Sequence, residues 1–336
     1  MRYTGAVLSP ALAFRPATVV DRLPPRSGAC PLSVRELLAA AAEGGLVLPL
    51  VRAPIAAVAR GALVAAKEQA AVIGLGLPQG VPSRVWFDAV ARAADEVAAG
   101  LPLFLSGDVL VAGEGGTQVE QAHRDAWRLV DDGLTHLAID VAAVSAGERG
   151  RVVGEVAEAG FDRGLSVEIV IPLGEGSQLG ARAADLFDEV ARRGAVPDLA
   201  GVRCPAPSDE TEAKVQAAAL ARISLALSGV PVIRRGPVTP RLLELLRASP
   251  VKACEDGGAA AGRAIELLPV GLTGEEEEPT SRQSPLERAA AELSGEGADR
   301  LETRAYVEVM DLVERLGARG GAPGVVRALE RRRLEQ

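Results

Sequence analysis

The sequence predicts an α/β fold of the (β/α)8, or TIM, barrel type, with an N-terminal extension and a C-terminal helical segment. Three observations predict it. The chain has 336 residues, which is enough for one barrel-sized domain and an appendage. Short apolar runs recur eight times, and their first residues lie 20 to 34 positions apart. Amphipathic stretches with helical spacing separate the runs, as in a parallel sheet covered by helices.

The first part of the chain is predicted to be irregular. Residues 1–32 contain several prolines and show no sustained periodicity. The regular pattern begins at Ser33, which can cap a helix together with Glu36. Gly44 and Gly45 supply the end of that helix. We therefore expect an irregular extension over 1–32 and the start of the barrel at residue 33.

The eight apolar runs are the predicted barrel strands, and they fall within residues 33–268. In chain order they are "LVLPLV" from Leu46, "AVIGLGL" from Ala71, "PLFLSGD" from Pro102, "HLAIDV" from His136, "SVEIVIPL" from Ser166, "LAGVRC" from Leu199, "PVIRRG" from Pro231 and "VKACEDG" from Val251. Eight such units favour a closed barrel. An open doubly wound sheet would more often show a G-x-G-x-x-G turn after its first strand, and "VRAPIA" contains none.

The chain beyond the barrel divides into two predicted parts. Residues 269–285 include four consecutive glutamates, which repel one another, and are predicted to form a solvated acidic linker. Residues 286–336 contain three helical patterns. We expect these helices to pack on the barrel or on a second subunit.

Composition excludes several classes of function. A net charge of −8 and an aromatic content of 3% argue against a nucleic-acid partner. No stretch of eighteen apolar residues is free of charge or proline, so no membrane partner is expected. The three cysteines are odd in number and widely spaced, which is typical of reduced thiols. We therefore expect a cytoplasmic protein.

The carboxyl ends of the strands are where a barrel of this type places its chemistry. Asp108 and Glu168 are the candidate catalytic acids there. A positive cluster on strands six to eight, with glycines that let backbone N–H groups approach an oxyanion, predicts an anion or phosphate site. Its members are Arg203, Arg234, Arg235, Gly236, Lys252, Gly257 and Gly258. In the alternative interpretation the arginines form salt bridges with Asp108, Glu168 and Glu255 and close the mouth.

Three segments resemble the class II aldolases, metal-dependent barrels that cleave fructose or tagatose bisphosphate. "LSVRELLAAAAEGGLVLPLVRAPIAAVARGALVAAKEQAAVIGLGL" resembles their opening helix and first two strands. "PLFLSGDVL" is similar to their third strand, in particular to the "GGDHL" form of the tagatose-bisphosphate aldolase accessory subunit. "GVPVIRRGPVTPRLLELLRASPVKACEDGG" is similar to their seventh and eighth units, usually "GVPLVLHGGSG" and "KINI". The resemblance extends from Leu32 to Leu268.

The resemblance implies a barrel without the family's metal ligands. Asp108 stands where the family has an Asp that exchanges a proton with the substrate hydroxyl, but Val109 replaces the adjacent metal-binding His. Arg235 replaces the His that precedes glycine on the seventh strand. The sixth strand ends "VRCPAPSD", without the usual histidine. We therefore expect no metal and no other cofactor, unless zinc or another divalent ion binds a rebuilt site.

Three functions remain open from the sequence. The first is a non-catalytic or altered aldolase-like protein of carbohydrate metabolism, which binds a phosphorylated sugar or another anion as an accessory or regulatory protein. The second is an active aldolase that cleaves a ketose bisphosphate through a rebuilt metal site. The third is a structural or assembly protein with a salt-bridged, closed barrel mouth. A homo-oligomer or an accessory subunit of a larger enzyme is the expected assembly.

Overall fold

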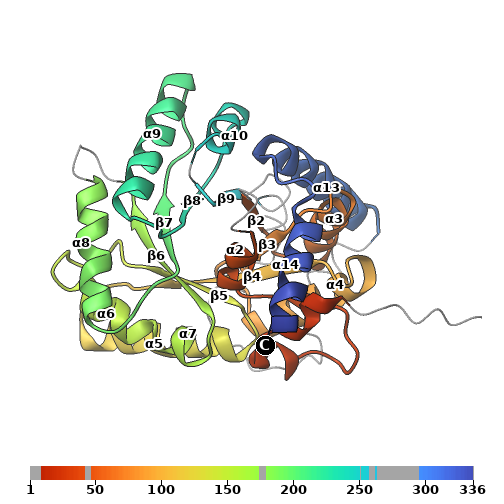
Figure 1. Ribbon diagram of the computed structural model, residues 1–336, viewed down its shortest axis with the longest axis horizontal. Helices are drawn as coiled ribbons and strands as arrows, with labels where there is room; N and C mark the ends of the chain where they lie inside the picture. The colour runs from red at the N-terminus through yellow and green to blue at the C-terminus, as the bar shows by residue number, and fades with distance from the viewer. Residues whose placement is uncertain are drawn as a thin grey trace, which may run out of the picture.

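Eight parallel strands close into a barrel at the centre of the computed structural model, which describes residues 9–41, 47–173, 179–249, 251–256, 262 and 295–335 (Figure 1). Each strand pairs in parallel with its neighbours, and the pairings β2–β9 and β4–β5 close the ring. The prediction of a (β/α)8 barrel is confirmed. The strands are β2 (Leu48–Arg52), β3 (Ile73–Gly76), β4 (Pro102–Leu110), β5 (His136–Asp140), β6 (Ser166–Pro172), β7 (Leu199–Arg203), β8 (Val232–Arg235) and β9 (Ala253–Asp256).

Apolar side chains on both faces of the strands explain the closed, helix-covered sheet. Every residue of β5 is buried, as are the first six residues of β6. Such strands are stable only where other elements cover both faces. Inside the barrel the ring of Phe104 on β4 lies against Gly74 on β3, where a Cβ would overlap it. This aromatic ring fills the interior below the charged side chains described later.

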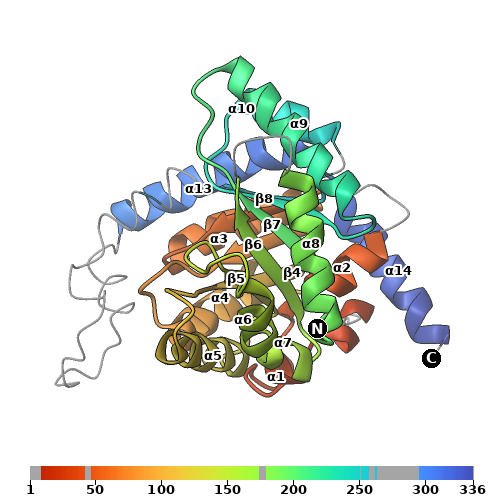
Figure 2. The ribbon, with the colours of Figure 1, turned by 90° about the vertical axis from the view of Figure 1, so that its left-hand side faces the viewer.

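A ring of helices surrounds the sheet, because each helix after a strand carries one apolar face (Figures 1 and 2). Consecutive helices contact one another around the barrel. They are α3 (Ala56–Glu68), α4 (Ser83–Val97), α5 (Gly116–Asp131), α6 (Arg149–Val156), α7 (Glu158–Asp162), α8 (Leu179–Arg192), α9 (Glu210–Ala226) and α10 (Pro240–Arg247).

The N-terminal segment is more regular than the sequence suggested. Its described part contains η1 (Pro10–Phe14), α1 (Ala17–Val20) and the two-residue strand β1 (Cys30–Pro31), and α2 (Val34–Ala41) follows. β1 pairs in parallel with Pro102 and Leu103 at the start of β4. The side chain of Asp95 fixes the backbone before β1, because it accepts hydrogen bonds from the backbone N–H groups of Gly28 and Ala29. Residues near 30 are thus held at the amino-terminal end of the barrel.

The two C-terminal helices pack directly on the barrel. α13 (Glu296–Leu316) lies along α3 and also contacts α10 and β2, so it occupies the place of the eighth outer helix (Figure 1). Gly61 on α3 permits the contact, because a Cβ there would overlap the carbonyl oxygen of Glu302. α14 (Gly321–Glu335) contacts α2 and η1. The predicted linker, 269–285, lies outside the described residues.

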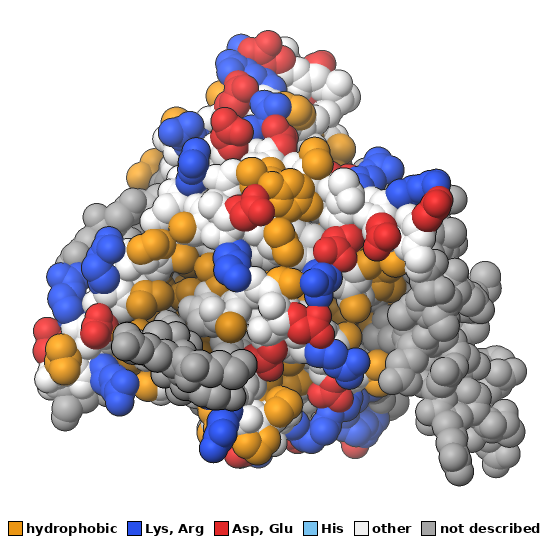
Figure 3. Space-filling model, turned by 90° about the vertical axis from the view of Figure 1, so that its right-hand side faces the viewer, with side chains coloured by type: hydrophobic (Ala, Val, Ile, Leu, Met, Phe, Trp, Pro, Cys, Tyr) orange, Lys and Arg blue, Asp and Glu red, His pale blue; other side chains and the backbone are white. Residues whose placement is uncertain are grey.

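The face that carries α13 and α14 shows basic and acidic side chains interspersed with small apolar areas (Figure 3). The coloured part of this face, which is formed by described residues, shows no broad surface of a single charge. Among the described helices, none combines the length and apolar character needed to cross a membrane.

Candidate functional site

Five charged side chains meet inside the barrel near the carboxyl ends of the strands. They form the central charge network, which consists of Arg52 on β2, Asp108 on β4, Glu168 on β6, Arg235 on β8 and Glu255 on β9. Four of them come from the alternate strands β2, β4, β6 and β8, as is typical of the layers that fill such barrels, and Glu255 is added from β9, between β8 and β2. The network contains both candidate catalytic acids and one of the predicted anion-binding arginines.

Arg235 lies at the centre of this network. Its Nε is 2.6 Å from Glu168 Oε1 and its Nη2 is 2.7 Å from Glu168 Oε2, which is a bidentate ion pair. Its Nη1 is 3.0 Å from Glu255 Oε2 and 3.2 Å from Asp108 Oδ1. The Arg235 side chain is 2% exposed and that of Glu168 is 0% exposed. The guanidinium therefore lies below the surface, between three carboxylates.

Arg52 completes the network from the opposite side. Its Nε is 2.5 Å from Glu255 Oε1 and its Nη2 is 2.7 Å from Asp108 Oδ2. Its Nη1 donates to the carbonyl oxygen of Leu77 at 2.8 Å. Together with the contacts of Arg235, these bonds give every carboxylate oxygen of the three acids a guanidinium partner.

The network holds Asp108 and Glu168 in the charged form. Burial favours the neutral form of Asp108, but the guanidiniums of Arg235 and Arg52 outweigh it, so the pKa of Asp108 lies below its ordinary value. Burial likewise opposes ionisation of Glu168, and Arg235 again prevails and lowers its pKa. Burial disfavours the charged form of Arg235, yet the surrounding carboxylates raise its pKa well above the ordinary value. None of these groups is poised to exchange a proton near neutral pH.

Two glycines make room for the network. A Cβ at Gly201 on β7 would overlap Oε1 of Glu168, and a Cβ at Gly76 on β3 would lie 3.0 Å from Cδ of Arg52. The sequence analysis did not single out these glycines. The signal was present, since a glycine inside a strand often marks the close approach of another group.

His136 lies one layer below the network and was not among the predicted site residues. Its Nε2 is 2.7 Å from Glu168 Oε2, and its Nδ1 is 3.0 Å from Ser166 Oγ. The side chains of His136 and Glu168 are both fully buried. His136 begins β5, and its register partner on β6 is Ser166, two residues before Glu168. Because side chains alternate along a strand, this register puts all three on the inner face.

The described residues of the predicted anion site do not converge on one point. Arg203 lies at the rim, 47% exposed, with its Nη2 2.7 Å from Asp140 Oδ2. Arg234 points to the outer side of the sheet and donates to the carbonyl oxygens of Pro205, Gly236 and Pro237. Alternation explains this, because adjacent residues of β8 face opposite sides.

The remaining residues of that site are also apart. Lys252 precedes β9, where its N–H donates to the carbonyl of Val232 at the start of β8, so it lies at the amino-terminal end of the barrel. Gly236 follows β8 with φ +112°, where a Cβ would overlap the carbonyl oxygen of Cys204. Gly257 and Gly258 lie outside the described residues.

The described residues do not fit a divalent metal. They contain no group of three or more His, Cys, Asp or Glu side chains arranged to hold one. The carboxylates that do converge are each bonded to guanidinium groups, and the cation among them is Arg235. Burial raises the pKa of the Cys204 thiol to about 11 and that of Cys254 to about 12, so neither is a ready thiolate ligand. A metal would have to displace an arginine to enter.

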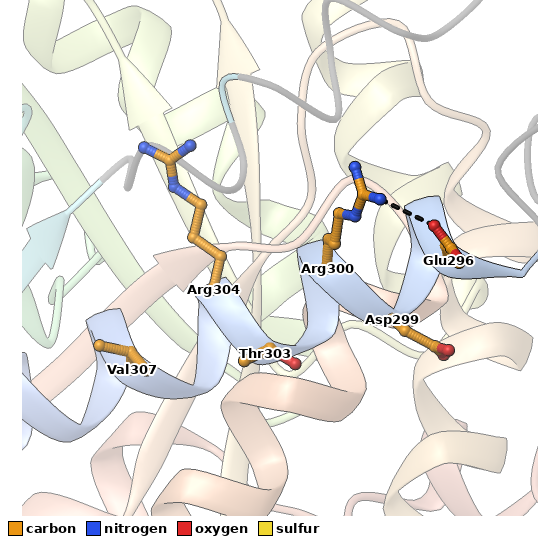
Figure 4. Close-up of a pocket in the computed structure, with 6 residues that line it drawn as sticks. All are labelled: Glu296, Asp299, Arg300, Thr303, Arg304 and Val307. Atoms are coloured by element: carbon orange, nitrogen blue, oxygen red, sulfur yellow. Dashed lines mark hydrogen bonds and ion pairs between the residues drawn. The ribbon is translucent and has the colours of Figure 1, made fainter.

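Outside the central charge network, a hollow with a volume of about 650 Å³ runs along α13 (Figure 4). Its described lining comes from this one helix, whose residues there are Glu296, Asp299, Arg300, Thr303, Arg304 and Val307. Arg300 Nη2 lies 2.8 Å from Glu296 Oε2, and Arg304 Nε lies 3.0 Å from Glu308 Oε1. Because both arginines are paired within their own helix, the hollow shows no convergent set of polar groups.

Comparison with solved structures finds two aldolases with the same architecture. The YdjI aldolase from Escherichia coli K12 superposes with a TM-score of 0.59 and 13% identity, over 86% of this chain and 98% of that one. The chain has the fold of an aldolase barrel. A proposed fructose-1,6-bisphosphate aldolase from Coccidioides immitis superposes with a TM-score of 0.58 and 15% identity, over 86% of this chain and 97% of that one.

Comparisons of sequence alone give no further relative. No protein-family description matches this aldolase-like barrel, and no curated protein matches it either. The resemblance inferred from the strand motifs is thus confirmed as a likeness of fold. The chemistry of the barrel interior depends on this chain's own residues.

Proposed function

We propose that this aldolase-like barrel is a non-catalytic protein that acts as a binding, accessory or regulatory component, with a structural charge network where its resemblance implies a metal site. One observation carries the proposal. The guanidinium of Arg235, at the position where the class II aldolases have a metal-binding histidine, is bonded to Glu168, Asp108 and Glu255. An arginine so placed excludes a divalent ion by charge and by volume.

The energetics of the cleavage reaction support the proposal. Cleavage of a ketose bisphosphate builds up negative charge on an enediolate, which the family stabilises with a divalent Lewis acid. Each 1.4 kcal/mol of lost stabilisation costs about a tenfold in rate. The guanidiniums here are already bonded to carboxylates, and Asp108 is held in its charged form by two of them. The network therefore lacks both a free electrophile and a free base.

Metal analysis combined with a cleavage assay tests the proposal. The protein is purified without chelators, its zinc, manganese, cobalt and iron contents are measured, and cleavage of fructose and tagatose bisphosphates is followed with each metal added. We expect less than stoichiometric metal and no turnover above the blank, with an active class II aldolase as the positive control. A stoichiometric bound metal together with turnover would show that the protein is a working aldolase.

The rim of the barrel has a half-exposed guanidinium, that of Arg203, which could bind a small anion. Arg203 is half-exposed at the carboxyl end of β7, its register partner on β8 is Arg235, and its positive charge helps to lower the pKa of Asp108. A phosphorylated sugar would meet this guanidinium first. Location in the cytoplasm and assembly as an oligomer or an accessory subunit stay predictions.

Thermal denaturation with and without ligand tests the anion site. We expect inorganic phosphate or fructose bisphosphate to raise the melting temperature of the wild type in a saturable way, because a ligand bound only to the native state stabilises it. Arg203→Gln should lose the shift. Arg193→Gln, in the turn directly after α8 and with a similar 46% side-chain exposure, should keep it. An equal shift in both variants would mean that the anion binds away from Arg203. No shift in the wild type would favour the closed structural barrel.

A further inference from the structure

The hydrogen bonds around His136 carry an inference that does not depend on the proposed function. We infer that the barrel stores one proton at neutral pH, on a fully buried His136 imidazolium that neutralises the central charge network. Two arguments lead to it independently. The first is the number of hydrogen atoms available for the bonds that His136 makes. The second is the net charge of the central charge network.

The first part of the hydrogen count concerns Nδ1. Ser166 Oγ, 3.0 Å from Nδ1, also donates to the carbonyl oxygen of Thr135 at 3.2 Å and accepts from the N–H of Val34 at 3.0 Å. A hydroxyl has a single hydrogen to donate but two lone pairs. Since that hydrogen is used toward Thr135, the bond between His136 and Ser166 needs a hydrogen on Nδ1.

The second part of the count concerns Nε2. Its partner, Glu168 Oε2, is 2.7 Å away, and Arg235 donates to both oxygens of that carboxylate at 2.6 and 2.7 Å. Bidentate pairing with a guanidinium is the geometry of an ionised carboxylate, which only accepts hydrogen bonds. Nε2 must then donate as well. A ring that donates from both nitrogens is an imidazolium.

The charge count gives the same answer. The central charge network contains three carboxylates and two guanidiniums, so by itself it carries one net negative charge. Each of its members is buried or nearly so, and an uncompensated charge in such surroundings is costly. Arg234 is also buried, but it lies on the outer side of β8 and donates to backbone carbonyls. Arg203 is paired with Asp140 at the rim. The positive charge in contact with the inner face of the network is therefore that of His136. The other acid close to this end of β6, Asp198, is already paired with Arg35 at 2.5 Å, so it does not compete for the histidine.

The stored proton links the barrel centre to the N-terminal segment. Through Ser166, the imidazolium is connected to the N–H of Val34, the first residue of α2. Loss of the proton would leave a net negative charge beside Glu168 and would remove the donor of one of these bonds. Folding should therefore take up a proton at pH values above the ordinary titration range of histidine for as long as the folded ring keeps its proton.

Nitrogen NMR of the ring tests the inference directly. The chain has two histidines, and His123 is partly exposed on α5, so His123→Gln leaves His136 as the single histidine signal. We expect both ring nitrogens of His136 to show imidazolium shifts at pH 7.5 and to change little up to pH 8.5. The His123 signal of the wild type, which is absent from His123→Gln, assigns the two histidines. A pyridine-type nitrogen on His136 at pH 7.5 would overturn the inference.

Unfolding equilibria give a second readout. Between pH 7 and 8.5 we expect the unfolding constant of the wild type to rise by up to about a tenfold per pH unit, since the unfolded chain releases the proton that the folded chain retains. His123→Gln should show the same dependence. His136→Gln should be less stable and should lose this part of the dependence. Equal slopes for wild type and His136→Gln would also overturn the inference, whatever the metal and cleavage assays show.

Discussion

Arg235→Met is expected to destabilise the protein by about 3–5 kcal/mol at pH 7, measured as the free energy of unfolding in urea. The substitution removes the guanidinium that bonds Glu168, Asp108 and Glu255 while preserving much of the apolar bulk. Asp108 and Glu255 then keep only Arg52, and Glu168 keeps only His136. The cost comes mainly from leaving buried negative charge unpaired.

The control for this variant is Arg203→Met at the rim. Arg203 makes one ion pair, with Asp140, and is 47% exposed, so its loss should cost less than about 1 kcal/mol. If both substitutions cost the same small amount, the central charge network does not have the structural role assigned to it.

The contribution of Asp108 and Glu168 to stability should depend on pH with opposite signs in the wild type and in Arg235→Met. In the wild type the pKa values of Asp108 and Glu168 are lowered, so their contribution to stability is present above the ordinary carboxyl range and is lost as the pH falls. Without Arg235 burial dominates and raises these pKa values, so the variant should gain stability as the pH falls from 7 toward 5. A loss of stability over that interval would contradict the explanation.

Gly61→Ala is expected to cost about 3 kcal/mol and to loosen the C-terminal helix. A Cβ at Gly61 would overlap the backbone carbonyl of Glu302, so α3 and α13 would have to move apart along their shared surface. Overlap with backbone cannot be relieved by a change of rotamer. Unfolding in urea measures the cost, and limited proteolysis of α13 shows whether the helix has been released.

Gly154→Ala is the matched control for that substitution. Gly154 lies inside α6, and no atom stands within 4 Å of the Cβ that it would gain. The change should stabilise the protein by about 0.5–1 kcal/mol, because alanine is the better helix former. A loss in both variants would mean that the cost at Gly61 is not specific to its contact with α13.

The strands could be predicted because their signals are local. Each barrel strand overlaps one of the eight apolar runs, and helices follow where the apolar spacing changes to that of a helix. The position of α13 could not be predicted in this way. It lies forty residues beyond β9, and its packing on α3 depends on the close approach at Gly61, which no periodicity reveals.

The site was predicted in part, for the same physical reason. Strand ends identified Asp108, Glu168 and Arg235 as residues of the barrel mouth, and the structure brings all three together. Arg234 and Lys252 were assigned to the same cluster, but alternation turns the first outward, and the second precedes its strand. Which charges pair depends on strand register.

The packing of α13 against α3 also affects how the protein is made. A ribosome synthesises all eight barrel strands before the helix that completes the outer ring emerges, so the growing chain exposes the apolar side of α3 for some time. Chaperones that bind the growing chain at that stage should contact this exposed apolar side of α3. The same surface should be exposed in a chain truncated before residue 296. Expression of nested C-terminal truncations should therefore give aggregates until the clone includes residue 316.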